Sequence, residues 1–351
     1  MFDSLSIGPL VVIFSAAAAA VWVAGISLSS STDVLDRRLG LGEALGGLIL
    51  LAIVTNLPEV AITFAAALSG RLPIAVGNIL GGIAIQTVVL AVLDLLWVRD
   101  GPSLMYRAAA LTLVLEAVLV VAVLSIAVMG SQLPGSAGLW RIEPASLAIL
   151  VVWVGGVALV GRSRRGLPWH EDGSAPGAQP QEMGHSKGRR AEVGLSRAAA
   201  AFFVAALVTL AGGVVLEQSG EAIARHIGLE GVLFGATLLA AATALPEIST
   251  GAAAVKLGDY QLAVSDIFGG NSFLPVLLLL ASVLAGRAVL PALQPSDIYL
   301  TGLGIVLTGV YVYGLVFRPR REILGMGLDS LVVVVLYVIG MAGLAVLTTS
   351  S

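Results

Sequence analysis

Two closely similar segments stand out in the chain: TNLPEVAITFAAALSGRLPIAVGNILGG at residues 55–82 and TALPEISTGAAAVKLGDYQLAVSDIFGG at residues 243–270. They align without a gap, so that Thr55 falls on Thr243 and Gly82 on Gly270. From Gly47 to Gly82, 16 of the 36 positions are identical to their counterparts from Gly235 to Gly270. The matches include Thr, Pro, Glu and paired Gly, which apolar composition alone would not place in register. The chain therefore contains an internal repeat.

The repeat lies in a chain that is too apolar for a water-soluble protein. Hydrophobic residues make up 58% of the 351 residues, charged residues make up 12%, and the mean hydropathy is +0.99. Soluble domains carry about 25% charged residues, and one helical membrane span needs about 20 apolar residues. The apolar runs do not alternate as β-barrel strands would. We expect an all-α polytopic membrane protein with ten transmembrane helices, at 7–28, 43–69, 73–98, 106–129, 145–161, 197–216, 231–257, 261–286, 297–317 and 327–348.

A polar connection divides these spans into two halves of five. Residues 162–196 are rich in Gly, Pro and charge, which is typical of a linker. The sequence thus predicts an N-terminal five-helix repeat at 1–161, with its α-repeat at about 47–90, and a C-terminal one at 197–351, with its α-repeat at about 235–278. Because five is odd, the second copy must enter the membrane inverted. Inverted repeats are typical of secondary transporters, which hold substrate near the midplane.

Basic residues predict the orientation, because Lys and Arg concentrate in cytoplasmic loops. With both termini outside and the linker 162–196 in the cytoplasm, 15 of the 19 basic residues lie on the cytoplasmic side, and only Arg71, Arg141, Arg225 and Arg287 lie outside. We therefore expect an integral protein of the plasma membrane, with inorganic cations and the lipid bilayer as partners. The net charge of −3 gives no sign of a nucleic-acid partner, and nothing in the sequence defines an oligomeric state.

Two acidic residues lie well inside repeated spans. Glu59 and Glu247 each follow a proline and occupy equivalent positions. An ionisable side chain at that depth costs several kcal/mol and normally marks a functional site. Since proline cannot donate to the carbonyl four residues earlier, Pro58 and Pro246 leave two backbone oxygens free for other partners.

Oxygen-bearing groups surround the two glutamates in sequence. Such groups suit hard cations such as Ca²⁺ and Na⁺. The candidate metal-binding set comprises the side chains of Glu59, Glu247, Thr55, Thr243, Asn56, Asn78, Gln86, Asp266 and Thr250, with the backbone carbonyls of Val54 and Ala242 and, on the same segments, those of Ala52 and Ala240.

These motifs resemble the α-repeats of the calcium/cation antiporter superfamily, the sodium/calcium exchangers and their proton- or potassium-coupled relatives. The resemblance is carried by TNLPE at 55–59, TALPE at 243–247, AVGN at 75–78 and AVSD at 263–266. It implies a cation site between the spans at 43–69, 73–98, 231–257 and 261–286, with access alternating as peripheral helices slide. It also implies transport of Ca²⁺ with Na⁺ or H⁺, and no cofactor.

The chain departs from the family pattern at several of these positions. The family serine three residues before each glutamate is Asn56 in one copy and Ala244 in the other. Gly82 and Gly270 replace ligand serines, whereas Gln86 and Leu274 replace a later Asn or Asp. The loss of side-chain oxygens favours H⁺ over Na⁺ as the counter-ion, because several Na⁺ ions need many ligands. The Thr-x-x-Pro-Glu motifs, in contrast, resemble the sodium-coupled branch more closely.

Two other functions remain possible at this stage. A cation channel could use the same oxygens, although an inverted repeat with broken helices suits alternating access better. Transport of another divalent cation is also compatible with the oxygen set. An intramembrane hydrolase lacks a nucleophile–base set, because the chain has no Cys and no expected span contains His. Of the remaining acids, we expect Glu116 to make a buried structural hydrogen bond or relay protons, and Asp94 to be solvated or paired with Arg99.

Overall fold

The computed structural model describes residues 2, 4–39, 53–98, 101–134, 143–163, 194–228 and 231–350. Within these ranges, eight helical spans are long and apolar enough to cross a membrane. The predicted helical membrane fold is therefore confirmed. The eight spans are formed by α1 (Ile7–Leu39), α4 (Leu72–Trp97), α6 (Leu111–Ser131), α7 (Pro144–Ser163), α8 (Leu195–Ile227), α12 with α13 (Tyr260–Phe273 and Leu277–Ala285), α14 (Pro295–Phe317) and α15 (Leu328–Ser350).

Two further helices begin at the repeated prolines. Pro58 lies in the first turn of α3 (Leu57–Leu68), and Pro246 lies in the first turn of α11 (Leu245–Lys256). Proline is favoured there because the first helical N–H groups have no partner within the helix. The preceding residues, Asn56 and Ala244, interrupt the helix as turns. In the second copy the axis bends by 42° between Val232–Thr243 and Leu245–Lys256, which confirms the expected kink.

The segment before the second kink is not a regular α-helix. It passes from α9 (Gly231–Phe234) through a π-helical turn, η2 (Gly235–Leu239), into α10 (Ala240–Thr243). We expected a continuous helix over 231–257, and the wide turn is not encoded by any simple residue pattern. Such turns occur frequently at functional sites. Of the equivalent expected span at 43–69, residues 43–52 lie outside the described part of the chain.

Glycines bring this irregular segment into backbone contact with α4. A Cβ atom at Gly235 would lie 2.8 Å from the carbonyl oxygen of Ile74, and one at Gly77 would lie 2.7 Å from the carbonyl oxygen of Val232. Small residues permit such close crossing of membrane helices. The two copies of the repeat thus meet directly at α4 and η2.

The helix boundaries follow the same alignment as the sequence repeat. When Glu59 is placed on Glu247, both ends of α1 coincide with those of α8, and both ends of α3 coincide with those of α11. Likewise, α4 coincides with the span of α12 and α13, which the 3-10 turn η3 (Leu274–Val276) joins. The internal repeat therefore includes helix lengths as well as motifs.

Several boundaries differ from expectation. Both α1 and α8 continue well beyond the expected ends at 28 and 216, to Leu39 and Ile227, so that His226 lies in the last turn of α8 rather than in a polar connection. The expected span at 106–129 is divided into α5 (Leu104–Ala108) and α6. A 3-10 turn, η4 (Leu290–Ala292), precedes α14, and a short antiparallel hairpin of β1 (Glu322–Ile323) and β2 (Met326–Gly327) precedes α15.

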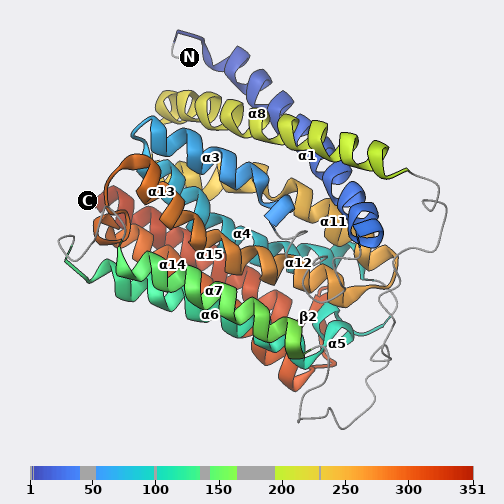
Figure 1. Ribbon diagram of the computed structural model, residues 1–351. Helices are drawn as coiled ribbons and strands as arrows, with labels where there is room; N and C mark the ends of the chain where they lie inside the picture. The colour runs from blue at the N-terminus through green and yellow to red at the C-terminus, as the bar shows by residue number, and fades with distance from the viewer. Residues whose placement is uncertain are drawn as a thin grey trace.

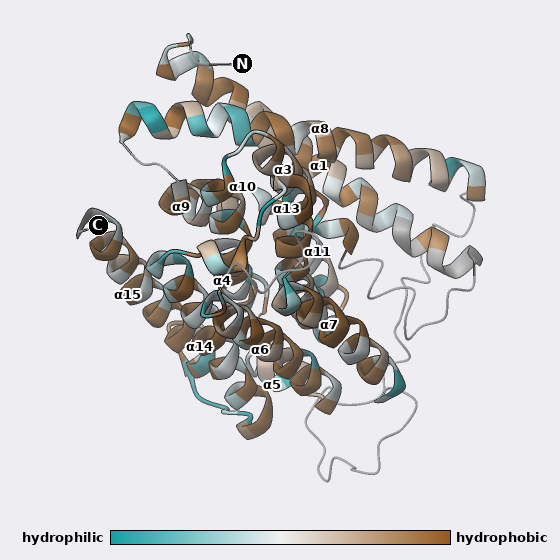
Figure 2. Ribbon diagram, turned by 60° about the vertical axis from the view of Figure 1, so that its left-hand side comes forward, coloured by the Kyte–Doolittle hydropathy of each residue, from teal (hydrophilic) through white to brown (hydrophobic). Residues whose placement is uncertain are grey.

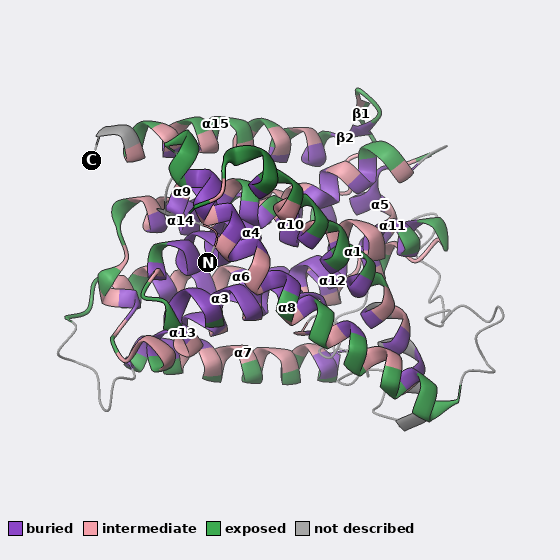
Figure 3. Ribbon diagram, turned by 90° about the horizontal axis from the view of Figure 1, so that it is seen from above, coloured by how far each residue is buried: buried purple, intermediate pink, exposed green. Residues whose placement is uncertain are grey.

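The helices form three groups in space. The long helices α1 and α8 lie against each other at one edge, α6, α7, α14 and α15 lie at the opposite edge, and the helices of the repeat motifs lie between them (Figure 1). Apolar residues continue over the outward faces of the helices (Figure 2), as a bilayer requires. Burial is greatest in the middle group (Figure 3). The constant spacing of the repeat thus places both glutamates at the centre of the bundle.

Candidate functional site

The carboxylates of the two repeated glutamates meet at one amide group. Nε2 of Gln86, on α4, lies 3.4 Å from Oε1 of Glu59 and 3.4 Å from Oε1 of Glu247. Both glutamates are at most 1% exposed. Each stands in the first turn of its helix, directly after the proline. The free N–H groups of a helix N-terminus favour negative charge there, which partly offsets the cost of burying each carboxylate.

Gln86 also reaches a third acceptor. Its Nε2 atom lies 3.3 Å from Oδ1 of Asn56. An amide nitrogen carries only two hydrogens, so the three oxygens compete for two donors. Its own Oε1 atom is buried and has no hydrogen-bond partner, and the same holds for Oε2 of Glu59 and Oε2 of Glu247. Two of these three unsatisfied oxygens belong to the carboxylates, and the third belongs to Gln86. Buried oxygens of this kind are the ligands that a hard cation prefers.

The residues around the proline breaks are buried with the glutamates. Thr55, Asn56 and Thr243 are each at most 1% exposed. The Thr243 side chain lies near the Glu59 carboxylate, so that a side chain of one copy approaches the glutamate of the other. Its hydroxyl also lies 3.2 Å from the carbonyl oxygen of Ala240. Of the expected carbonyl ligands, those of Val54 and Ala242 belong to buried residues, and that of Ala52 lies outside the described residues.

Asp266 is buried rather than solvated. It is 4% exposed, and its Oδ2 atom accepts a 2.6 Å hydrogen bond from the hydroxyl of Thr250, one turn after Glu247. The same hydroxyl lies 3.2 Å from the carbonyl oxygen of Glu247. Asn78, its counterpart in the first copy, is fully buried, and neither of its amide atoms has a hydrogen-bond partner. The alternative of a solvated acid at the start of α12 is therefore wrong.

Apolar packing occupies the places where the resemblance implies further ligands. Leu274 is completely buried, and a Cβ atom at Gly82 would lie 3.5 Å from its Cδ1 atom. A Cβ atom at Gly270 would lie 2.7 Å from Nδ2 of Asn56. Thus the Asn56 amide uses the space that Gly270 leaves open, and the Leu274 side chain contacts the backbone at Gly82. Gly82, Gly270 and Leu274 therefore form a packed flank of the site that offers no side-chain oxygen.

One polar residue near the site was not in the expected set. Asn271, on α12, donates from Nδ2 to Thr87 Oγ1 at 3.0 Å and lies 3.4 Å from the carbonyl oxygen of Ile83. These bonds tie α12 to α4 beside the glutamates. Its position immediately after the paired glycines was a usable signal, although packing alone would have explained it equally well.

Carboxylates alone do not form a cluster here. Within the described ranges, no group of three or more His, Asp or Glu side chains is arranged to hold a metal ion. Any cation at this position would be held by two carboxylates together with hydroxyl, amide and carbonyl oxygens. Such a mixed oxygen set suits Ca²⁺, which takes six to eight oxygen ligands in flexible geometry.

Two other acids were expected to lie away from the site. Asp94, at the end of α4, is 1% exposed and accepts hydrogen bonds from Leu104 N, Gly327 N and Ser330 Oγ at 2.7–2.8 Å. The expectation of a solvated acid is thus wrong, because the backbone of the β1–β2 hairpin folds over this carboxylate, whereas Arg99, the other expected partner, lies outside the described residues. Glu116, in contrast, is buried within α6 as expected, at 7% exposure.

Glu143 was not singled out in the sequence, and it accepts hydrogen bonds near the end of α13 as Asp94 does near the end of α4. It precedes α7 and accepts hydrogen bonds from Ser146 Oγ at 2.9 Å, from Ser282 Oγ at 3.0 Å and from the backbone N–H groups of Val289 and Leu290. Ser282 is the repeat counterpart of Asp94. A carboxylate and a serine hydroxyl therefore hydrogen-bond to each other near the end of α4, and another such pair forms near the end of α13.

A helical membrane bundle with two buried carboxylates on repeated, proline-broken helices defines a polytopic protein of the cation-exchanger class. The profile of the family described as sodium/calcium exchanger protein matches residues 9–160 and 197–346. The chain therefore belongs to the sodium/calcium exchanger protein family.

Two curated relatives are similar over most of the chain. Inner membrane protein YrbG of Escherichia coli strain K12 is 26% identical over 276 residues, covering 78% of this chain and 77% of that protein. Putative antiporter CaxA of Alkalimonas amylolytica is 24% identical over 253 residues, covering 72% of this chain and 73% of that protein. Their names describe a membrane protein and an antiporter, as the family does.

Solved structures share the fold at low sequence identity. The crystal structure of the H⁺/Ca²⁺ exchanger CAX matches with a TM-score of 0.70 at 13% identity, over 99% of this chain and 88% of that one. The sodium–calcium exchanger NCX_Mj soaked with 100 mM Na⁺ and 10 mM Sr²⁺ matches with a TM-score of 0.62 at 14% identity, over 96% of this chain and 99% of that one. Together with the family match over residues 9–160 and 197–346, these likenesses confirm the predicted superfamily.

Proposed function

We propose that this protein is a secondary-active antiporter that exchanges Ca²⁺ for H⁺ by alternating access. The observation that carries the proposal is the meeting of the Glu59 and Glu247 carboxylates at Gln86, in a buried position with unsatisfied oxygens. Two carboxylates neutralise one Ca²⁺ ion, and two protons neutralise the same two carboxylates. The pair is electrically neutral in both loaded states, which suits a low-dielectric site.

The remaining candidate residues complete the coordination in this proposal. Ca²⁺ lies between α3, α4, α11 and α12 and uses both glutamates first. Rotation of the Gln86 amide by half a turn would replace its donor nitrogen with its oxygen, so that one side chain serves the empty and the loaded site. The other oxygens of the set come from Thr55, Thr243, Asn56, Asn78, Asp266 and Thr250 and from the carbonyls of Ala52, Val54, Ala240 and Ala242.

Alternating access follows from the proposed topology. We assign ten spans as two inverted five-helix repeats, 1–161 and 197–351, joined by a cytoplasmic linker at 162–196. Both termini then lie outside the plasma membrane. In such an arrangement the two copies exchange conformations around a fixed midplane site. The shared helix boundaries of the two halves, which coincide when Glu59 is placed on Glu247, support this assignment.

Na⁺ is the alternative counter-ion, and the site flank argues against it. Coordination of several Na⁺ ions needs many oxygens, yet Gly82, Ala244, Gly270 and Leu274 supply no side-chain oxygen. Leu274 instead packs beside Gly82. A proton binds to one carboxylate oxygen and needs no further ligands. The smaller oxygen set therefore favours H⁺.

The test is ⁴⁵Ca²⁺ uptake into proteoliposomes with Na⁺ and pH gradients imposed separately and the membrane potential clamped. We expect uptake to follow the pH gradient at equal Na⁺. Uptake driven by Na⁺ at equal pH, with no response to a pH gradient, would assign Na⁺ instead. Mn²⁺ and Mg²⁺ as competitors define the transported cation. Downhill ⁴⁵Ca²⁺ flux that needs no counter-ion on either side would point to a channel.

A further inference from the structure

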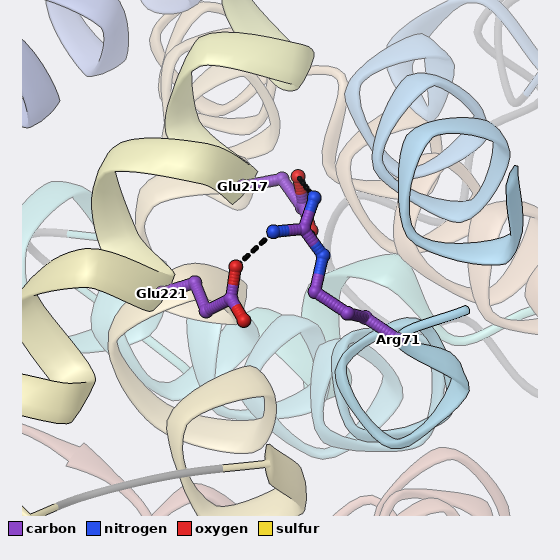
Figure 4. Close-up of polar contacts among 3 residues, drawn as sticks. All are labelled: Arg71, Glu217 and Glu221. Atoms are coloured by element: carbon purple, nitrogen blue, oxygen red, sulfur yellow. Dashed lines mark hydrogen bonds and ion pairs between the residues drawn. The ribbon is translucent and has the colours of Figure 1, made fainter. Parts of the chain in front are cut away.

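An ion-pair cluster outside the candidate site joins α8 to the start of α4. Nη2 of Arg71 donates a hydrogen bond to Oε2 of Glu217 at 3.0 Å, and Nε of Arg71 lies 2.9 Å from Oε1 of Glu217 as an ion-pair contact without hydrogen-bond geometry (Figure 4). The third guanidinium nitrogen pairs with Glu221. Hydrogen bonds between two charged groups are stronger than those between neutral groups.

The cluster depends on its arginine. The Glu217 side chain is completely buried and that of Glu221 is 18% exposed, whereas 26% of the Arg71 side chain remains exposed. The two glutamates are four residues apart on one face of α8, where like charges repel. Without Arg71, a buried carboxylate would have a second carboxylate as its neighbour. The pairing thus holds α8 to the connection between α3 and α4.

Elsewhere the α1–α8 pair meets the helices of the site mainly through small residues, with one side-chain hydrogen bond from Trp22 Nε1 of α1 to Ser249 Oγ of α11. Gly213 of α8 lies against Pro58 and Ala61, and Gly25 of α1 lies against Pro246. Both contacts fall on the proline breaks beside the two glutamates. Glycine and proline provide no side-chain hydrogen bonds to lock these surfaces. The Arg71 cluster is therefore the ion-paired attachment of α8 to these helices within the described residues.

The second half of the chain lacks the residues for an equivalent cluster. In the alignment of the two halves, Arg71 corresponds to Asp259, Glu217 to Ser29 and Glu221 to Asp33. The Asp259 side chain instead caps α12 by accepting from Leu262 N at 3.0 Å. An aspartate cannot pair with a serine and a second aspartate as an arginine pairs with two glutamates. The residues that form this attachment are therefore not repeated at the equivalent positions of the other half.

We propose that Arg71 is a positioning residue for alternating access, because its ion pairs hold the extracellular end of α8 against the α3–α4 connection and keep that face closed. This inference rests on the proposed antiport function and orientation. In an inverted-repeat transporter the two end states are approximately equivalent by exchange of the copies. A contact whose residues are not repeated in the other half shifts the balance between them by its own differential free energy. The cluster thus favours the state open to the cytoplasm.

The test measures access from outside with a thiol reporter. The chain contains no cysteine, so Thr63→Cys introduces a single thiol one turn beyond Glu59, at a buried position whose hydroxyl has no hydrogen-bond partner. Labelling by a membrane-impermeant maleimide in proteoliposomes of known orientation is followed for the full chain. In the reporter background, Arg71→Gln is expected to raise the external labelling rate roughly fivefold or more, the lower range of coupling between two sites.

Two further variants distinguish loss of the Arg71 ion pairs from misfolding of the protein. Arg71→Gln combined with Glu217→Gln leaves no buried unpaired charge at residue 217 and is expected to label as fast as Arg71→Gln. Exchanging the charges, with Arg71→Glu and Glu217→Arg, restores a pair and is expected to return labelling toward the slow rate. Arg287→Gln, the same change at an exposed arginine predicted to lie on the same side, is the matched control and leaves labelling unchanged.

Unchanged labelling in both Arg71→Gln variants would overturn the proposal. So would a charge exchange that labels as fast as the single variant. Labelling requires no transported ion, so this outcome is independent of ⁴⁵Ca²⁺ uptake. A protein whose labelling responds to Arg71 but which moves no Ca²⁺ would refute the proposed function and leave the attachment intact.

Discussion

Asn56 of the first copy lies directly against Gly270 of the second, so that a Cβ atom at residue 270 would come within 2.7 Å of the Asn56 amide nitrogen. The two departures from the family pattern therefore compensate each other in space. The serine missing at residue 270 gives room to an amide that is larger than the serine missing at residue 56. Neither position can be understood without the other.

This contact predicts a coupled pair of substitutions. Gly270→Ser alone inserts a side chain into a filled space, and such overpacking typically costs about 1–3 kcal/mol. We expect it to lower the thermal stability of the purified protein and to reduce ⁴⁵Ca²⁺ uptake. Asn56→Ser in the same chain should recover most of the loss. A double variant no better than Gly270→Ser alone would contradict the pairing.

The two glutamates should be individually indispensable for transport but not for folding. Glu59→Gln and Glu247→Gln preserve the side-chain shape and remove the charge that a divalent cation needs in a low-dielectric site. We expect each variant to lose ⁴⁵Ca²⁺ exchange while eluting as a folded protein. Glu116→Gln, a buried acid in α6, is the matched control and should retain exchange. Wild-type exchange in either glutamate variant would defeat the assignment.

Asp266 should contribute to ion affinity through its position beside Thr250. Its carboxylate accepts the Thr250 hydroxyl at 2.6 Å, one turn from Glu247, and Asn in its place can still accept that bond. We therefore expect Asp266→Asn to keep the fold and to weaken apparent Ca²⁺ affinity about tenfold, which equals about 1.4 kcal/mol. Saturation of the initial ⁴⁵Ca²⁺ uptake rate measures this. Unchanged affinity and unchanged pH dependence would show that Asp266 has no part in binding.

Glu143 should matter for stability rather than transport. Its carboxylate satisfies two serine hydroxyls and two backbone N–H groups at the ends of α7 and α13. Oε1 accepts three of these bonds and Oε2 accepts one, so Glu143→Ala, which removes both oxygens, leaves buried donors unsatisfied, each at about 1–3 kcal/mol. We expect a lower Tm in detergent with Ca²⁺ affinity unchanged. Ser146→Ala, which removes one of the four donors, should have a smaller effect, and equal effects would contradict this account.

Local sequence was sufficient to place Glu59 and Glu247 together. Two in-register Pro-Glu pairs in apolar spans imply a repeat, and two copies of a membrane motif at equal depth are expected to lie close together. The role of Gln86 was only partly accessible. Its position was among the candidates, but its donation to both carboxylates depends on how α4 passes between α3 and α11.

Asp94 and Glu143 show where sequence reasoning ended. Their partners, Gly327 and Ser330 for Asp94 and Ser282 and Val289 for Glu143, lie far away along the chain, in the other half of the protein. No local sequence pattern predicts which distant backbone N–H groups will donate hydrogen bonds to a given carboxylate. The π-helical turn at Gly235–Leu239 was missed for the same reason, because close packing against α4 decides it rather than residue propensity.

A substitution at Leu274 tests whether the charge balance of the site suits exchange of Ca²⁺ for protons. It is fully buried beside Gly82 at the position where the family has Asn or Asp. Leu274→Asp adds a further carboxylate to a site in which Asp266 already lies near the two glutamates that balance one Ca²⁺ ion. The loaded site then carries one extra negative charge, or binds one extra monovalent cation, so exchange should become sensitive to membrane potential.

The measurement is ⁴⁵Ca²⁺ flux in proteoliposomes across a series of clamped potentials. We expect wild-type flux to be nearly independent of potential, because Ca²⁺ and two protons carry equal charge. Flux in Leu274→Asp should depend on potential and should respond to Na⁺ if the new carboxylate supplies the missing ligand. Leu274→Asn is the matched control, since it adds polarity of the same size without charge and should keep the wild-type response. Wild-type flux that already varies steeply with potential would contradict the electroneutral exchange from which this prediction starts.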